Sequence, residues 1–151
     1  MYTNRNEWGL DFIRQCMITF EVVPRVTGLE NIPREGRFLI AANHPLGGLD
    51  GIALMDVVGQ VRKDVIFPVN DILMNIPNLY ELFIPINKHG SNADNIRLFN
   101  KAFASDAPIL YFPAGLVSRK QNGKVRDLEW KKTFLTKAKQ NDRDIVPCYI
   151  G

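Results

Sequence analysis

Hydrophobic and polar residues alternate along the chain in two distinct patterns. Apolar positions at helical spacing predict four helices, over residues 7–20, 49–61, 92–104 and 127–139. Short, nearly continuous apolar runs are typical of strands covered on both faces, and they occupy residues 37–43, 64–70, 82–87, 108–115 and 144–151. Pro24 lies in a further extended stretch, which we expect to be an edge strand because proline cannot donate to a sheet. Strands alternating with helices predict an α/β fold.

The length of the chain indicates a single domain. We expect it to cover residues 1–151, with an N-terminal amphipathic helix within 1–21. Hydrophobic residues make up 46% of the chain and charged residues 23%, so it can bury a core and is not disordered throughout. These features predict one mixed sheet flanked by helices. The chain stops on an apolar strand without a polar tail, and we expect a core truncated at its C-terminus.

Membrane-spanning and disulfide-rich classes are not favoured by the sequence. No apolar run approaches the roughly 18 residues that a spanning helix needs. The N-terminus lacks the basic flank and apolar run of a signal peptide. Cys16 and Cys148 lie near opposite ends, which suits neither a disulfide scaffold nor a metal site. We therefore expect a cytoplasmic, reducing setting.

The positive charge of the chain is unevenly distributed. Residues 119–139 contain eight Lys or Arg and two Asp or Glu, whereas the whole chain carries a net charge of +3. Such a basic segment favours an anionic partner: phosphate groups, a membrane surface or nucleic acid. A solvated helix face explains the same composition, so charge alone does not choose between these interpretations.

His44 is the first candidate for chemistry. It lies directly after the apolar run 37–43 and before a predicted helix, where α/β proteins usually place their sites. Asp50 begins that helix. Its carboxylate either holds the imidazole N–H and makes the ring a better base, or simply caps the helix N-terminus. On spacing alone, a structural histidine beside a capping aspartate remains the alternative.

Other site classes find less support. His89 lies among turn residues and is interpreted as a loop histidine. The chain lacks H-E-x-x-H, paired Cys/His clusters, G-x-S-x-G, a P-loop and G-x-G-x-x-G, which argues against metal, serine-hydrolase and nucleotide sites. Gly115 follows a predicted strand and is succeeded by Ser118, Arg119 and Lys120, a combination that suits a phosphate cradle. Any surface turn has similar composition, so this signal is weak by itself.

Four separated segments together resemble one family. They are similar to the conserved blocks of the glycerolipid acyltransferases in the lysophosphatidic acid acyltransferase superfamily. The resemblance covers residues 26–151, begins with the lead-in VTGLENIP, and has its blocks in the family's order: ANHPLGGLDG, FIPINK, LYFPAGLVSRK and DIVPCYIG. It implies a glycerol-3-phosphate acyltransferase-like fold.

The blocks also depart from the usual family pattern. Five residues separate His44 from Asp50 where the family has four, and the Gly-Gly turn between them can absorb the extra residue. Ala114 and Leu116 stand where the family commonly has Glu and Thr, and Lys88 replaces Arg. The combination of NHPLGGLDG with FPAG is similar to the hemolysin-like subgroup tied to aminolipid acylation. An acyl-amino-acid acceptor is therefore a rival to a lyso-phospholipid.

The resemblance implies transfer of an acyl chain from a thioester, acyl-CoA or acyl-ACP, to an acceptor hydroxyl. His44 would be the general base and Asp50 its orienting partner, with no bound cofactor or metal. The substrate-binding residues that it implies are Asn43, Lys88, Gly115, Ser118, Arg119 and Lys120. We expect a protein that lies peripherally on the inner face of the membrane.

A non-catalytic function is the alternative. The same fold can serve as an inactive membrane-lipid-binding module, with the basic segment 127–139 or the helix 7–20 lying on a bilayer. Nucleic acid is not expected, because Trp130 and Phe134 fall on an apolar stripe that is typical of a core rather than of exposed stacking residues.

Overall fold

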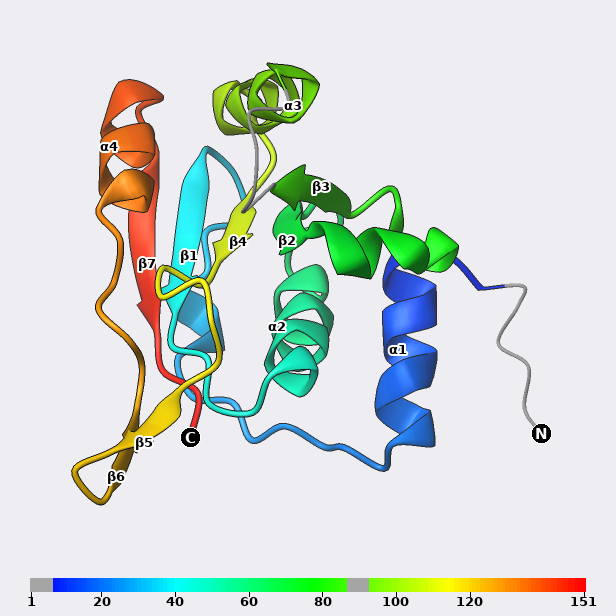
Figure 1. Ribbon diagram of the computed structural model, residues 1–151. Helices are drawn as coiled ribbons and strands as arrows, with labels where there is room; N and C mark the ends of the chain where they lie inside the picture. The colour runs from blue at the N-terminus through cyan, green and yellow to red at the C-terminus, as the bar shows by residue number, and fades with distance from the viewer. Residues whose placement is uncertain (1–6, 87–92) are drawn as a thin grey trace.

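The computed structural model describes residues 7–86 and 93–151. Its four α-helices and seven strands follow one another along the chain as shown in Figure 1. In chain order they are α1 (Gly9–Thr19), β1 (Phe38–Ala42), α2 (Gly48–Gly59), β2 (Phe67–Asn70), β3 (Phe83–Ile86), α3 (Ala93–Ala104), β4 (Ile109–Tyr111), β5 (Arg119–Gln121), β6 (Lys124–Arg126), α4 (Thr133–Gln140) and β7 (Asp144–Cys148). Short 3₁₀ turns occupy Leu29–Asn31, Asp71–Asn75 and Pro77–Leu79. The chain has the α/β architecture expected from its sequence.

The strands that carry the core run parallel. β1 pairs with β4 on one side and with β7 on the other, and β2 pairs with β3. An isolated parallel bridge between Ile66 and Ile109 connects the β2–β3 pair to β4. Among the described residues, antiparallel pairing occurs only in the β5–β6 hairpin. β1 therefore lies in the interior of the sheet, and all five of its residues are buried.

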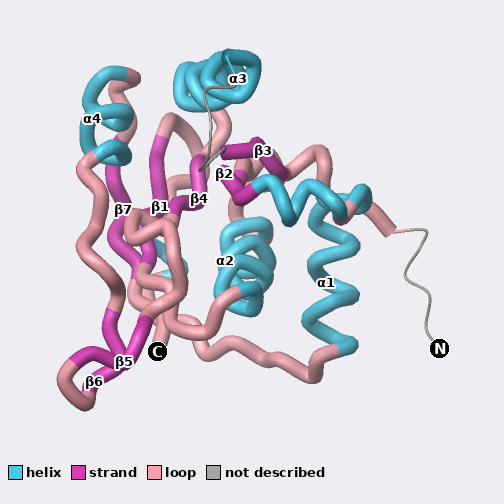
Figure 2. Tube along the Cα trace, viewed as in Figure 1, coloured by secondary structure: helices cyan, strands magenta, loops and turns pink. Residues whose placement is uncertain are grey.

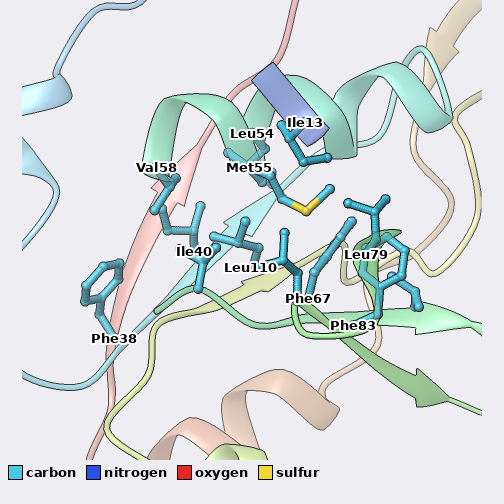
Figure 3. Close-up of a cluster of buried hydrophobic side chains, with 14 residues drawn as sticks. Ile13, Phe38, Ile40, Leu54, Met55, Val58, Phe67, Leu79, Phe83 and Leu110 are labelled. Atoms are coloured by element: carbon cyan, nitrogen blue, oxygen red, sulfur yellow. The ribbon is translucent and has the colours of Figure 1, made fainter. Parts of the chain in front are cut away.

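The alternating side chains of β1 divide the core into two clusters. Phe38, Ile40 and Ala42 belong to the cluster that includes residues of α1 and α2, part of which is seen in Figure 3. Leu39 and Ala41 point to the other face and pack with residues of α3 and α4. Because helices cover both faces of the sheet at β1, every residue of this strand is buried, and its sequence is therefore continuously apolar.

Two expectations about local structure are wrong. The stretch around Pro24 forms no strand, and β7 rather than this stretch pairs beside β1. The predicted helix 127–139 begins only at Thr133, and Figure 2 shows the segment that joins β6 to α4 as a loop. Hydrogen bonds of Asp127, and of the Lys131 N–H with the Pro113 carbonyl, hold that segment in loop form.

The predicted apolar stripe of this helix is consequently only half correct. Phe134 and Ala138 are buried, whereas Trp130 lies in the loop and is 38% exposed, and Leu135 is 47% exposed. The remaining predicted helices and strands are present, with ends that differ by a few residues. None of the helices in residues 7–86 and 93–151 has the length and apolar character required to cross a bilayer.

Candidate active site

His44 and Asp50 meet at the carboxyl end of the central strand. His44 follows β1 after one residue, and Asp50 lies in the first turn of α2. The imidazole Nδ1 lies 2.9 Å from Asp50 Oδ2, so the expected contact is present despite the extra residue in the turn. Gly47 makes this possible, because its φ of 82° and ψ of −133° belong to a region that is open mainly to glycine.

The Asp50 carboxylate is fixed by the turn that it closes. Its side chain is fully buried, and Oδ2 also accepts hydrogen bonds from the backbone N–H groups of Leu46, at 2.8 Å, and Gly47, at 3.0 Å. Its Oδ1 is buried and has no hydrogen-bond partner within the described residues. A carboxylate ion accepts hydrogen bonds and cannot donate them, so His44 Nδ1 donates in this contact, and the neutral form of the ring has its lone pair on Nε2.

Phe112 fixes the plane of the imidazole ring. The two rings are stacked, with centroids 4.1 Å apart and an interplanar angle of 13°. Phe112 directly follows β4 and meets the ring of Phe67 edge-on at 5.4 Å. The first and third sequence blocks therefore come together at His44, whose side chain is 16% exposed.

Asp127 ties a third segment to His44. Its Oδ1 accepts hydrogen bonds from the His44 backbone N–H at 3.1 Å and from the Ser118 hydroxyl, and its Oδ2 accepts from Trp130 Nε1 at 2.7 Å. The Ser118 N–H donates in turn to the His44 carbonyl. Partial burial acts to raise the pKa of the Asp127 carboxyl, but the hydrogen bonds from Ser118, His44 and Trp130 outweigh it and the pKa lies below its ordinary value.

The structure assigns Asn43 a contact within the fold. Its side-chain amide donates to the Ile150 carbonyl at 2.7 Å, and its oxygen accepts from the Ile150 N–H at 2.6 Å. These two hydrogen bonds extend the contact between β1 and β7 beyond their last paired residues, Ala42 and Cys148. Both polar atoms of the Asn43 side chain therefore hold the Ile150 backbone beside the sheet, and a role of Asn43 in substrate binding stays a prediction.

Four further predicted binding residues, Gly115, Ser118, Arg119 and Lys120, lie in the β5–β6 hairpin or in the turn that leads into it. Ser118 is bonded to Asp127, and Arg119 and Lys120 are exposed on β5. Gly115 forms a turn with φ of 68°, and a Cβ placed on it would lie 3.8 Å from Lys131 Nζ. Lys88 and His89 lie outside the described residues.

Three residues near the site were missed in the sequence. Phe112 belongs to the apolar run 108–115 and carries no chemical signal there. Asp127 and Lys131 are two more charges in a segment whose spacing is typical of a helix face. Only the fold shows that Asp127 reaches His44. In the described part of the chain, no three side chains from His, Cys, Asp and Glu gather as metal ligands.

We predict that Asp127→Asn destabilises the fold in a pH-dependent way. At neutral pH the variant loses charge-assisted hydrogen bonds, and its free energy of unfolding is expected to fall by about 1–2 kcal/mol. A carboxyl whose pKa is lowered by folding stabilises the protein above its unfolded pKa of about 3.9, and this stabilisation is lost as the pH falls through the folded value. The difference between the two proteins should therefore shrink in acid.

Urea unfolding of both proteins at neutral and acid pH measures this difference. The matched control is Asp142→Asn, at an exposed aspartate of the turn before β7, which should change stability little at either pH. If the loss of unfolding free energy in Asp127→Asn stays constant or grows in acid, the assigned hydrogen bonds are contradicted.

Comparisons with known proteins find a family and two curated relatives that match the chain over nearly its whole length. A family model described as acyltransferase matches residues 1–151. A protein of Bacteroides thetaiotaomicron named lyso-glycine lipid O-acyltransferase is 45% identical over 98% of this chain and 55% of its own length. A protein of the same name from Phocaeicola vulgatus is 46% identical over 97% of this chain and 53% of its own length. The chain thus spans about half the length of these curated relatives. No solved structure matches it significantly.

Proposed function

We propose that this chain, which belongs to the acyltransferase family, carries the catalytic part of a lyso-aminolipid O-acyltransferase. The enzyme would move a fatty acyl chain from acyl-CoA or acyl-ACP to the free hydroxyl of an acyl-amino-acid lipid. The observation that carries this proposal is the His44–Asp50 pair at the carboxyl end of β1, with its 2.9 Å contact. The names of the two relatives support an aminolipid as the acceptor.

His44 Nε2 would act as the general base. It takes the proton of the acceptor hydroxyl while the oxygen forms a bond to the thioester carbonyl carbon. The tetrahedral intermediate then collapses, the carbon–sulfur bond breaks, and the proton passes to the departing thiolate. Asp50 stabilises the imidazolium in between, because the buried carboxylate lies against Nδ1. The products are an ester and a free thiol.

Direct attack by the acceptor is preferred over an acyl-enzyme route. The Ser118 hydroxyl has a carboxylate partner in Asp127, a contact that the sequence did not reveal. The lowered pKa of Asp127 makes it a weak base, so it is poorly suited to activate a serine. Burial raises the pKa of the Cys148 thiol and disfavours the thiolate that nucleophilic attack requires.

The cations around the glycine turn would bind the anionic part of a substrate. Arg119, Lys120 and Lys131 are exposed, and Lys131 approaches Gly115. A carboxylate of an amino-acid lipid and a phosphate of the donor are both suitable ligands for such cations. We assign Lys88 to the same task on the resemblance of its sequence block. The protein would work at the inner face of the membrane, where a lipid acceptor resides.

Release of free thiol from the donor, measured with a panel of acceptors, tests this function. The full-length protein is given acyl-CoA or acyl-ACP together with a lyso-glycine lipid, with lysophosphatidic acid, or with no acceptor, all in neutral detergent micelles. We expect rapid thiol release and an acylated product with the lyso-glycine lipid. Preference for lysophosphatidic acid would refute the acceptor class. Vesicle binding without thiol release from either donor would instead favour the inactive lipid-binding module.

A further inference from the structure

The β5–β6 hairpin concentrates positive charge without compensation. Four of its residues are Lys or Arg and none is acidic: Arg119, Lys120, Lys124 and Arg126. All four are exposed. The ion pairs found among the described residues all lie elsewhere in the fold. The hairpin therefore carries four cations that have no carboxylate partner in the described part of the chain.

The pairing register places these cations on both faces of the hairpin. Arg119 is directly opposite Arg126, Gln121 is opposite Lys124, and Lys120 is opposite Val125. Cross-strand partners share a face, so one face holds Arg119, Lys124 and Arg126, and the other holds Lys120 and Val125. Like charges directly opposite one another destabilise a strand pair, and binding of an anionic partner removes this cost.

The hairpin is attached rigidly to the candidate active site. The residue before it, Ser118, and the residue after it, Asp127, are bonded to each other and to the backbone of His44. Figure 1 shows the hairpin extending away from the helices and the sheet, near the C-terminal end of the chain. Whatever binds the hairpin is consequently held at a fixed position relative to His44.

Exposed apolar side chains accompany the charge. Val125 in β6 is 66% exposed. At the base of the hairpin, Leu46, Leu116 and Val117 are 62%, 41% and 39% exposed. Val117 lies close to the backbone next to Leu46, because a Cβ placed on Gly47 would be 3.6 Å from a methyl group of Val117. The turn that contains His44 is thus bordered by apolar side chains and the basic hairpin.

We propose that the β5–β6 hairpin docks the enzyme on an anionic lipid bilayer and places His44 at the surface that holds its acceptor. This inference rests on the proposed function for its biological purpose. A bilayer suits the hairpin better than an acidic protein does, because a protein surface covers one face of a projecting hairpin. Immersion among lipid headgroups brings phosphates to both faces and buries Val125 with the stems of the Lys and Arg side chains.

Co-sedimentation of the full-length protein with vesicles tests the hairpin. One set is phosphatidylcholine alone, and the other is phosphatidylcholine mixed with phosphatidylglycerol. The variant combines Lys124→Gln with Arg126→Gln. We expect it to bind the anionic vesicles about 30-fold more weakly, since each Lys or Arg near an anionic surface contributes roughly fivefold. Binding of the unaltered protein should prefer the anionic vesicles and weaken with added salt.

The matched control removes the same charge at the other end of the molecule. Lys101 on α3 and Lys139 on α4 are exposed, and both helices lie far from the hairpin in Figure 1. The combination of Lys101→Gln with Lys139→Gln should leave vesicle binding nearly unchanged. Equal losses in the two variants would show an effect of net charge and would overturn the proposal.

Activity in neutral detergent micelles separates this proposal from the proposed function. The Lys124→Gln, Arg126→Gln variant should transfer acyl chains normally there, because no anionic surface is involved. Unchanged binding of this variant to anionic vesicles would refute docking through the hairpin. Weakened binding to an acidic carrier protein, with vesicle binding intact, would assign the hairpin to a protein partner instead. A protein that is inactive in micelles yet binds vesicles through the hairpin would refute only the transferase activity.

Discussion

His44→Ala should lower the turnover of acyl transfer by about 10²–10⁴-fold, because it removes the general base while the remaining site stays in place. Binding of the acyl donor should change little, since the imidazole ring contacts Asp50 and Phe112 within the fold and the backbone hydrogen bonds of residue 44 survive the substitution. Steady-state kinetics with a lyso-glycine lipid measure turnover, and titration with a non-transferable donor analogue measures binding.

Substitution of two carboxylates of α2 gives a second test of the His44–Asp50 pair and a matched control. Asp50→Asn keeps the base but weakens its orienting partner, so its loss should be comparable to or milder than that of His44→Ala. Asp56→Asn changes a carboxylate on the same helix that pairs with Arg14 at 3.3 Å, and its turnover should remain normal. Retention of full turnover in His44→Ala, with its fold intact by circular dichroism, would remove His44 from the mechanism.

We expect the second large effect, a loss of stability, from substitution of Arg143. Arg143 is 6% exposed, and its guanidinium donates hydrogen bonds to five backbone carbonyls, those of Phe38, Ala102, Phe103, Ser105 and Ala107. Four of these carbonyls lie in the last turn of α3 or just after it, and that of Phe38 begins β1. One side chain therefore satisfies the C-terminus of a helix and joins it to the central strand.

Arg143→Met should reduce the free energy of unfolding by about 3–5 kcal/mol, because several buried carbonyls lose their donor at once. Arg143→Lys should recover only part of this loss, since an ammonium group has three donors in place of five. Urea unfolding measures both variants. Arg97→Met on the exposed side of α3 is the control and should cost far less. A loss below about 1 kcal/mol for Arg143→Met would contradict this role.

The core of the fold could be predicted because its signals are local. The continuous apolar run of β1 and the helical spacing of α2 and α3 each reflect burial on the faces that they occupy. The β5–β6 hairpin was missed although Asn122 and Gly123, with φ of 50° and 79°, form the Asn-Gly turn typical of hairpins. Its strands carry charge instead of alternating apolar residues, so the hydrophobic pattern gave no indication of them.

The candidate site was predictable where its partners are near in sequence. His44 and Asp50 lie six positions apart, and the turn between them brings them together. Asp127 is 83 positions from His44, and no spacing rule connects them. The hydrogen bonds of Asn43 were not predicted, because its partner, the Ile150 backbone, lies 107 positions away. In each case the deciding contact is tertiary, and a pattern within one segment cannot contain it.

Intact-mass spectrometry of the full-length protein, mixed first with acyl donor and then with lyso-glycine lipid, tests the central claim most directly. We predict that the protein mass stays unchanged with donor alone. On addition of the acceptor, acylated lipid and free thiol should form in equal amounts, and His44→Ala should form neither at a comparable rate. An acyl adduct on Ser118 or Cys148 that appears with donor alone and disappears on addition of the acceptor would contradict direct attack and the role of His44 as its base.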